Sequence, residues 1–117
     1  MVVVYGIPNC DNVKKTISWL RAKRIAFELY DYKKEGAPPA QLKRWCAVKG
    51  WETIFNKRST TWKELLDSGV AGVTNGKEAL AVMTKHTSII KRPILEAGDE
   101  IIVGFNENEY IQQLIKK

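Results

Sequence analysis

Residues 2–13, VVVYGIPNCDNV, decide the fold of this chain. The segment opens as an apolar, β-prone run and breaks at Gly6 and the Pro-Asn turn that follows. Beyond the turn, Val13, Ile17 and Leu20 recur at the spacing of one helical face. The segment therefore predicts a strand, a tight turn and an amphipathic helix.

Cys10 stands at the boundary between that strand and that helix. Asn9 is expected to cap the helix, and Asp11 is a favourable acid for its first turn. A thiol in a first turn faces unpaired backbone N–H groups and the positive end of the helix dipole, which favour the nucleophilic thiolate. We interpret Cys10 as a reactive nucleophile. The alternative is a small buried residue, since free cysteine is often buried.

Length and composition indicate one globular α/β domain. With 117 residues, 44% hydrophobic and 27% charged, the chain can build a core. It shows neither a signal sequence nor an apolar stretch long enough to span a membrane. Two distant cysteines, Cys10 and Cys46, favour reduced thiols over a disulfide framework. We expect a cytoplasmic monomer.

The net charge of +6 is concentrated in one half of the chain. Residues 1–60 carry 12 Lys and Arg against 5 Asp and Glu, whereas residues 61–117 carry 7 against 8. The excess positive charge lies in the half of the chain that contains Cys10, and it favours an anionic partner such as glutathione, an oxyanion or an acidic protein surface. A solvated basic helix face is the alternative. Without a dense basic run or interleaved aromatics, nucleic acid is not expected as a partner.

The remaining periodicity predicts a βαβ unit, a helical insertion and a ββα unit, which is a thioredoxin-like order. Residues 51–60 are expected to be irregular. The capping pair Asn106 and Glu109 predicts a final helix with Ile111, Leu114 and Ile115 inward. We expect a single domain over 1–117. The other predicted strands lie near 2–5, 26–32, 93–96 and 100–103, and the predicted helices near 11–23, 39–49 and 77–85, with a further short helix that Thr60 or Thr61 caps and that runs through Leu66. The core is expected at about 1–33 and 87–117, and the insertion at about 34–86.

Three segments of the chain form a specific set: YGIPNCD at 5–11, NKRSTTW at 56–62 and IIKRPIL at 89–95. In this order and spacing, they resemble the ArsC/Spx superfamily of arsenate reductase-like proteins. The closest likeness is to the YffB-like branch, and it runs from about residue 2 to residue 114. The resemblance implies a thioredoxin-like fold with a helical insertion and a nucleophilic cysteine after the first strand.

The resemblance also implies a set of site residues around Cys10. Arg58 and Arg92 match family arginines that converge on the cysteine, and two guanidinium groups would stabilise a thiolate and grip an oxyanion or carboxylate. Pro93 matches a proline that is usually cis in such folds. Alternatively, Arg58 is an ordinary surface residue and Arg92 packs its stem along the sheet. The expected catalytic residues are Cys10, Arg58 and Arg92, and the expected substrate-binding residues are Asn9, Asn12, Arg58, Arg92 and Pro93.

Three departures from the family patterns narrow the expected function. Gly104 stands where glutaredoxin-linked arsenate reductases carry a third arginine, and Gly6 where they carry a histidine, so genuine arsenate reduction is not expected. Val13 stands where Spx-type regulators have the second cysteine of a Cys-x-x-Cys pair, which argues against an internal redox switch. The pattern favours a glutathione-dependent thiol reductase.

We therefore expect Cys10 to form a mixed disulfide that glutathione or a glutaredoxin resolves. Glutathione would be a co-substrate, with no bound cofactor, and one histidine with two distant cysteines provides no metal site. Cys46 is expected to be a packing residue, with a resolving thiol as the alternative. A non-catalytic Spx-like regulator that binds RNA polymerase or another protein is the alternative function.

Overall fold

The computed structural model describes residues 1–116; Lys117, the last residue of the predicted domain, lies outside the described residues. The chain divides into two compact units. One joins residues 1–34 to the segment that starts at Arg92, and the other comprises Glu35–Lys91.

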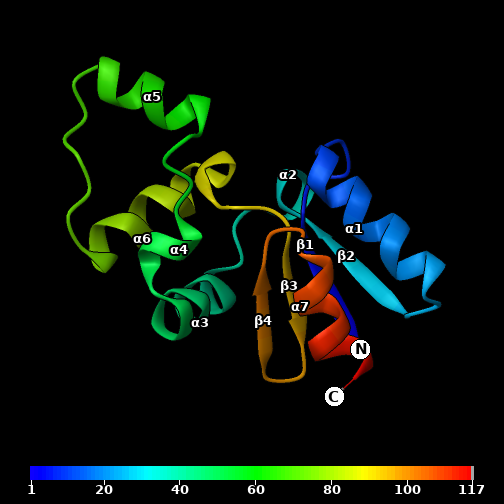
Figure 1. Cartoon of the computed structure of the whole chain (residues 1–117). Helices are drawn as coiled ribbons and strands as arrows, with labels where there is room; N and C mark the ends of the chain where they lie inside the picture. The colour runs from blue at the N-terminus through cyan, green and yellow to red at the C-terminus, as the bar shows by residue number, and fades with distance from the viewer. Residues whose placement is uncertain (117) are drawn as a thin grey trace. The chain divides into compact units, whose positions relative to one another are not determined.

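The first unit is built on a four-stranded mixed sheet of order β2-β1-β3-β4 (Figure 1). β1 (Val2–Gly6) pairs in parallel with β2 (Phe27–Asp31). β3 (Ile94–Ala97) pairs antiparallel with both β1 and β4 (Glu100–Val103). Parallel neighbours require a crossover, and α1 (Asp11–Ala22) supplies it. The predicted α/β, thioredoxin-like order of elements is confirmed.

Helices α1 and α7 (Glu107–Tyr110) cover one face of this sheet (Figure 1). The predicted helical stripe of α1 is confirmed, because Val13 and Leu20 are buried and Ile17 packs against the same core. The core residues that the two helices and the sheet share are Val2, Val4, Val13, Trp19, Leu20, Leu95, Ile102 and Tyr110.

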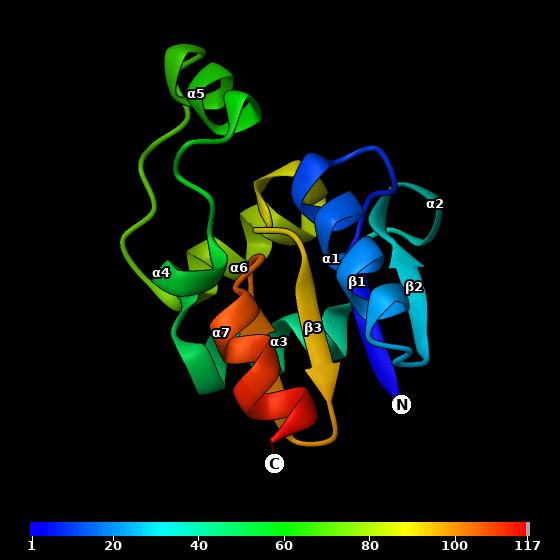
Figure 2. The same cartoon turned by 45° about the vertical axis from the view of Figure 1, so that its right-hand side comes forward.

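The second unit is helical. It contains α3 (Pro39–Lys49), α4 (Trp51–Ile54), α5 (Thr60–Asp67) and α6 (Gly76–Lys85). α3, α4 and α6 pack against one another, and two extended segments connect them to α5 (Figure 2). A 3₁₀ turn over Thr87–Ile89 closes the unit.

Two short helices were not predicted. The expectation that residues 51–60 are irregular is wrong for α4, which starts directly after Gly50 ends α3. Gly50 takes a φ of +86°, which turns the chain sharply enough for a second helix to begin at once. α2 (Tyr32–Glu35) forms a single turn directly after β2, where only the end of a strand was expected.

The C-terminal helix begins as predicted and ends differently. Asn106 Oδ1 accepts a hydrogen bond from the backbone N–H of Glu109 at 3.0 Å, so the predicted cap is confirmed. The expectation that Ile115 faces inward is wrong, since its side chain is 48% exposed. Residues 111–115 wind as a π-helix, in which Lys116 N bonds to Ile111 O, and this wider turn carries Ile115 off the apolar face.

Within residues 1–116, no helix has the length and apolar character that crossing a bilayer requires.

Candidate active site

Cys10 is the N-cap residue of α1. Its backbone is extended (φ −82°, ψ 131°), and its carbonyl accepts the first helical hydrogen bond from Lys14 at 2.9 Å. The turn before it is closed by Cys10 N bonding to Ile7 O at 3.2 Å. The expectation that Asn9 caps the helix is therefore wrong by one residue, and the thiol itself occupies the capping position. Asp11 is the acidic first-turn residue, as predicted.

The surroundings of Cys10 favour its thiolate. Partial burial by itself raises the pKa of the Cys10 thiol, but the backbone N–H groups of Val13 and Asn12 and the side chain of Arg92 outweigh it and lower that pKa below its ordinary value. Arg92 acts through a hydrogen bond and through its charge. The thiol does not close a standard capping hydrogen bond. The two amides and the guanidinium therefore stabilise mainly the thiolate form of Cys10.

Gly6 brings the start of α1 close to the end of β1. A Cβ atom built at Gly6 would lie 2.6 Å from Val13 Cγ2 and 3.5 Å from Arg92 Cβ. The first of these distances is too short for any side chain, so only glycine allows this packing of Val13. Gly6 thus sets the position of the helix turn that carries the amides facing Cys10.

Arg92 lies immediately before β3, and the Arg92–Pro93 peptide bond is cis. Pro93 is buried, and its carbonyl accepts a hydrogen bond from Gly104 N at 2.8 Å. Arg92 itself is half-buried. The end of β4 therefore holds the segment that carries the guanidinium to Cys10.

A group of tyrosines lies on the sheet near Arg92. Tyr5 Oη donates to Glu96 Oε1 at 2.7 Å, and its ring packs against that of Tyr30 with centroids 5.2 Å apart. Tyr30 packs in turn on Tyr32, whose ring is buried. Burial raises the pKa of Tyr32, and the positive charge of Arg92 opposes that rise only in part. These rings add apolar surface on the sheet near Arg92.

The other predicted site residues differ in position. Asn9 and Asn12 flank Cys10 and are exposed. Arg58 is exposed in the second unit, in a turn closed by its N–H bonding to Asn56 Oδ1 at 3.1 Å. The structure thus brings Arg92 to Cys10 within one unit, and the role of Arg58 stays a prediction. The backbone N–H groups expected to face Cys10 are those of Val13 and Asn12.

Cys46 differs from Cys10 in its electrostatics. It lies within α3, away from the helix N-terminus, and burial raises the pKa of its thiol. Residues 1–116 contain no group of three or more His, Cys, Asp or Glu side chains that could hold a metal ion.

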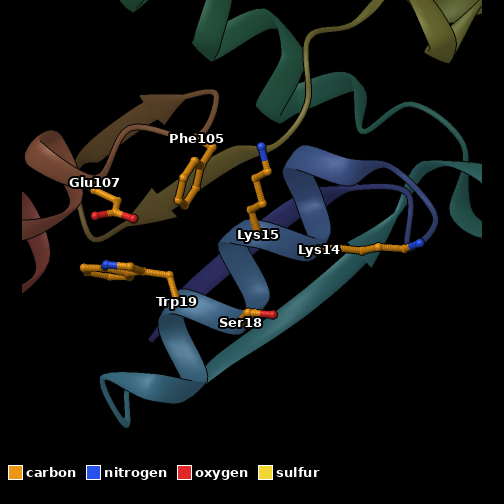
Figure 3. A pocket seen from close by; sticks show the side chains of 6 residues that line it. All are labelled: Lys14, Lys15, Ser18, Trp19, Phe105 and Glu107. Atoms are coloured by element: carbon orange, nitrogen blue, oxygen red, sulfur yellow. The ribbon is translucent and has the colours of Figure 1, made fainter.

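A shallow pocket of about 600 Å³ lies beside α1, along the part of the helix between Lys14 and Trp19 (Figure 3). Trp19 on α1 and Phe105, which follows β4, provide aromatic side chains to it. Charged and polar groups complete the lining: Lys14, Lys15, Ser18 and Glu107. Neither Cys10 nor Arg92 lines it, so it is distinct from the candidate active site.

Fold and site together define a thioredoxin-like protein whose cysteine caps the first helix beside an arginine–cis-proline segment. The chain belongs to the ArsC family, which matches residues 5–113. It is 41% identical over 110 residues to an uncharacterised protein of Haemophilus influenzae, covering 94% of this chain and 96% of that protein. The solved structure of a YffB protein superposes with a TM-score of 0.90 at 38% identity, covering 97% of this chain and 99% of that one.

A regulator is also among the relatives. The regulatory protein MgsR of Bacillus subtilis is 28% identical over 115 residues, covering 97% of this chain and 90% of MgsR. The predicted resemblance to the ArsC/Spx superfamily, with the likeness to YffB, is confirmed.

Proposed function

We propose that this protein is a thiol oxidoreductase that uses Cys10 as nucleophile and glutathione as co-substrate. The observation that carries the proposal is the position of Cys10 at the N-terminus of α1, where two backbone amides and Arg92 lower its pKa. The thiolate is the form of cysteine that attacks oxidised sulfur, so a lowered pKa increases the reactive fraction of Cys10.

The reaction that fits this site is the reduction of a glutathione mixed disulfide, RS–SG. The Cys10 thiolate attacks the glutathione sulfur, a Cys10–SG bond forms, and the RS⁻ leaving group takes a proton to give RSH. A second glutathione thiolate then attacks the sulfur of the bound glutathione. Oxidised glutathione leaves, and Cys10 returns as thiolate; a glutaredoxin could replace glutathione in this second step.

The charged side chains of the site would bind anionic groups of the substrate. Arg92 would pair with a glutathione carboxylate or stabilise the leaving thiolate, and Arg58 would add a second cation. Asn9 and Asn12 are exposed on either side of Cys10, where they could hydrogen-bond the peptide backbone of glutathione. Pro93 would shape the adjoining wall.

The test is release of thiol from a peptide–glutathione mixed disulfide in excess glutathione. We expect turnover by wild type, loss of turnover in Cys10→Ser, and near wild-type turnover in Cys46→Ala. Both variants should keep the circular dichroism spectrum of the parent. No turnover above the uncatalysed rate in wild type, with Cys10 free and reduced, would contradict the proposal.

The likeness to MgsR supports a second candidate, a non-catalytic regulator that binds RNA polymerase or another protein. Such a regulator would bind RNA polymerase in a pull-down with purified components, and the binding would survive Cys10→Ser. Val13 takes the place of the second cysteine of a Cys-x-x-Cys switch, so binding would not depend on a disulfide at this site.

A further inference from the structure

The hydroxyl of Tyr110 joins α7 to two other segments of the first unit. Tyr110 Oη lies 2.6 Å from Gly104 O and 3.0 Å from Thr16 Oγ1. A carbonyl only accepts, so the single tyrosine proton goes to Gly104 and Thr16 donates to Tyr110. Tyr110 and Thr16 are both fully buried, so the hydrogen bond between them is shielded from water, whereas the bond to the half-buried Gly104 is part-buried.

Gly104 passes this restraint to the arginine–proline segment. Its carbonyl accepts from Tyr110, and its N–H donates to Pro93 O at 2.8 Å. It adopts a φ of +83°, which a residue with a side chain rarely takes. Tyr110 therefore restrains Gly104, and the N–H of Gly104 in turn holds Pro93, the neighbour of Arg92.

These contacts form a continuous path of interacting residues, called the circuit below, that starts and ends on α1. Thr16 lies within α1, and the path runs through Tyr110, Gly104 and Pro93 to Arg92, which acts on Cys10 at the start of the same helix. The path joins residues that are far apart in the sequence, and each hydrogen-bonded step has a short distance.

The ring of Tyr110 is fixed between two aromatic neighbours. Trp19 packs against it with centroids 5.3 Å apart, and Phe105 meets it edge-on at 5.7 Å. These are the two aromatic side chains that line the pocket beside α1 (Figure 3). Burial raises the pKa of Tyr110 to about 12, so the hydroxyl remains a donor at physiological pH.

We infer that Tyr110 is a positioning residue for the Cys10 site, which acts by holding Gly104 and Pro93 so that Arg92 stays against the sulfur. The inference rests on the proposed function of Cys10 as the nucleophile. It assigns to a buried tyrosine on the last helix a specific role in the acidity of a thiol that it does not touch.

The experiment compares the pH profiles of Cys10 alkylation by iodoacetamide, read by mass, in wild type, Tyr110→Phe, Thr16→Val and Thr16→Ser. Tyr110→Phe keeps the ring and removes both hydrogen bonds, so we expect an inflection at higher pH and a rate at pH 7 lower by about two- to fivefold. Thr16→Val loosens Tyr110 only at α1 and should give a smaller shift in the same direction. Thr16→Ser should restore the wild-type profile.

Ser18→Ala is the control, since it removes a hydroxyl from an exposed position of α1 that lies outside the circuit, and its profile should match wild type. A folded Tyr110→Phe with the wild-type profile would overturn the inference. Should Tyr110→Phe fail to fold, an unchanged profile in Thr16→Val would overturn it instead. Failure of the proposed function would give a distinguishable result, because wild type itself would then show no lowered pKa of the Cys10 thiol or no turnover of the mixed disulfide.

Discussion

Arg92 acts on the sulfur of Cys10 through both a hydrogen bond and its charge, although the two residues are far apart in the sequence. The sheet makes this meeting possible, because β1 leads into Cys10 and its partner β3 follows directly after Arg92. The pairing of these two strands thus places a cation at the start of α1.

Replacing Arg92 by alanine should raise the pKa of Cys10 toward that of a free thiol, since it removes a hydrogen bond and a positive charge from the thiolate. We expect kcat/KM for a glutathione mixed disulfide to fall by about tenfold. Arg92→Lys keeps the positive charge but lacks the forked donors of arginine, so its kcat/KM should lie between the values for wild type and Arg92→Ala. Arg21→Ala, which removes an exposed arginine elsewhere on α1, is the control; an equal loss in both alanine variants would argue against a role of Arg92 at Cys10.

Arg58→Ala tests the site residue that lies in the second unit. If Arg58 contributes a second cation to the site, the alkylation profile of Cys10 should move to higher pH and the KM for the mixed disulfide should rise. Lys57→Ala is the matched control, because it removes a cation from the neighbouring exposed position. Identical profiles and KM values in the two variants would show that Arg58 is an ordinary surface arginine.

Gly6→Ala should destabilise the fold by about 1–3 kcal/mol, because the new Cβ would overlap Val13 Cγ2 and displace the first turn of α1. Urea unfolding measures the change in free energy. Gly72→Ala is the control, since a Cβ there has no atom within 4 Å among the described residues and its φ is not left-handed. Equal stability of the two variants would mean that α1 can move away from β1 at little cost.

Gly104 gives a test of substrate preference. With glycine in place of the family's third arginine, we expect wild type to bind arsenate weakly and to reduce it slowly or not at all. A Cβ at Gly104 meets open space, so Gly104→Arg fits at a cost of about 1–2 kcal/mol for its left-handed backbone. Arsenate affinity by calorimetry should then rise by about ten- to a hundredfold.

Gly98→Arg provides the control for that experiment, since it has the same left-handed backbone and open surroundings in the turn between β3 and β4. It should bear the same backbone cost without any gain in arsenate affinity. Rapid arsenate turnover by wild type would show that the third arginine is dispensable.

Much of the fold could be predicted because its signals are local. The apolar stripe of α1, the helix over residues 39–49 and the cap at Asn106 each depend on neighbours in sequence, and each was found in the structure. The two short helices α2 and α4 were missed, since four residues are too few to show a helical period. Ile115 was misplaced because the spacing was read as an α-helix where the chain forms a π turn.

The site was harder to predict than the fold. Cys10 was found from the strand-to-helix boundary, and Arg92 from the resemblance to a family. No sequence pattern predicts the hydrogen bonds that join Thr16, Tyr110 and Gly104. They depend on how α7 packs beside α1 on the same face of the sheet. Tertiary hydrogen bonds of this kind become visible only when the packed elements are seen together.

The most direct test of this account is the alkylation of Cys10 and Cys46 in one sample of native wild-type protein, followed by mass as a function of pH. Alkylation requires the thiolate, so each rate rises as the pH passes through the pKa of that thiol. We predict that Cys10 inflects below the value of about 8.5 typical of a free thiol, because Arg92 and the helix amides stabilise its thiolate, and that Cys46 inflects above it because of burial. An inflection of Cys10 at or above that of Cys46 would contradict the account.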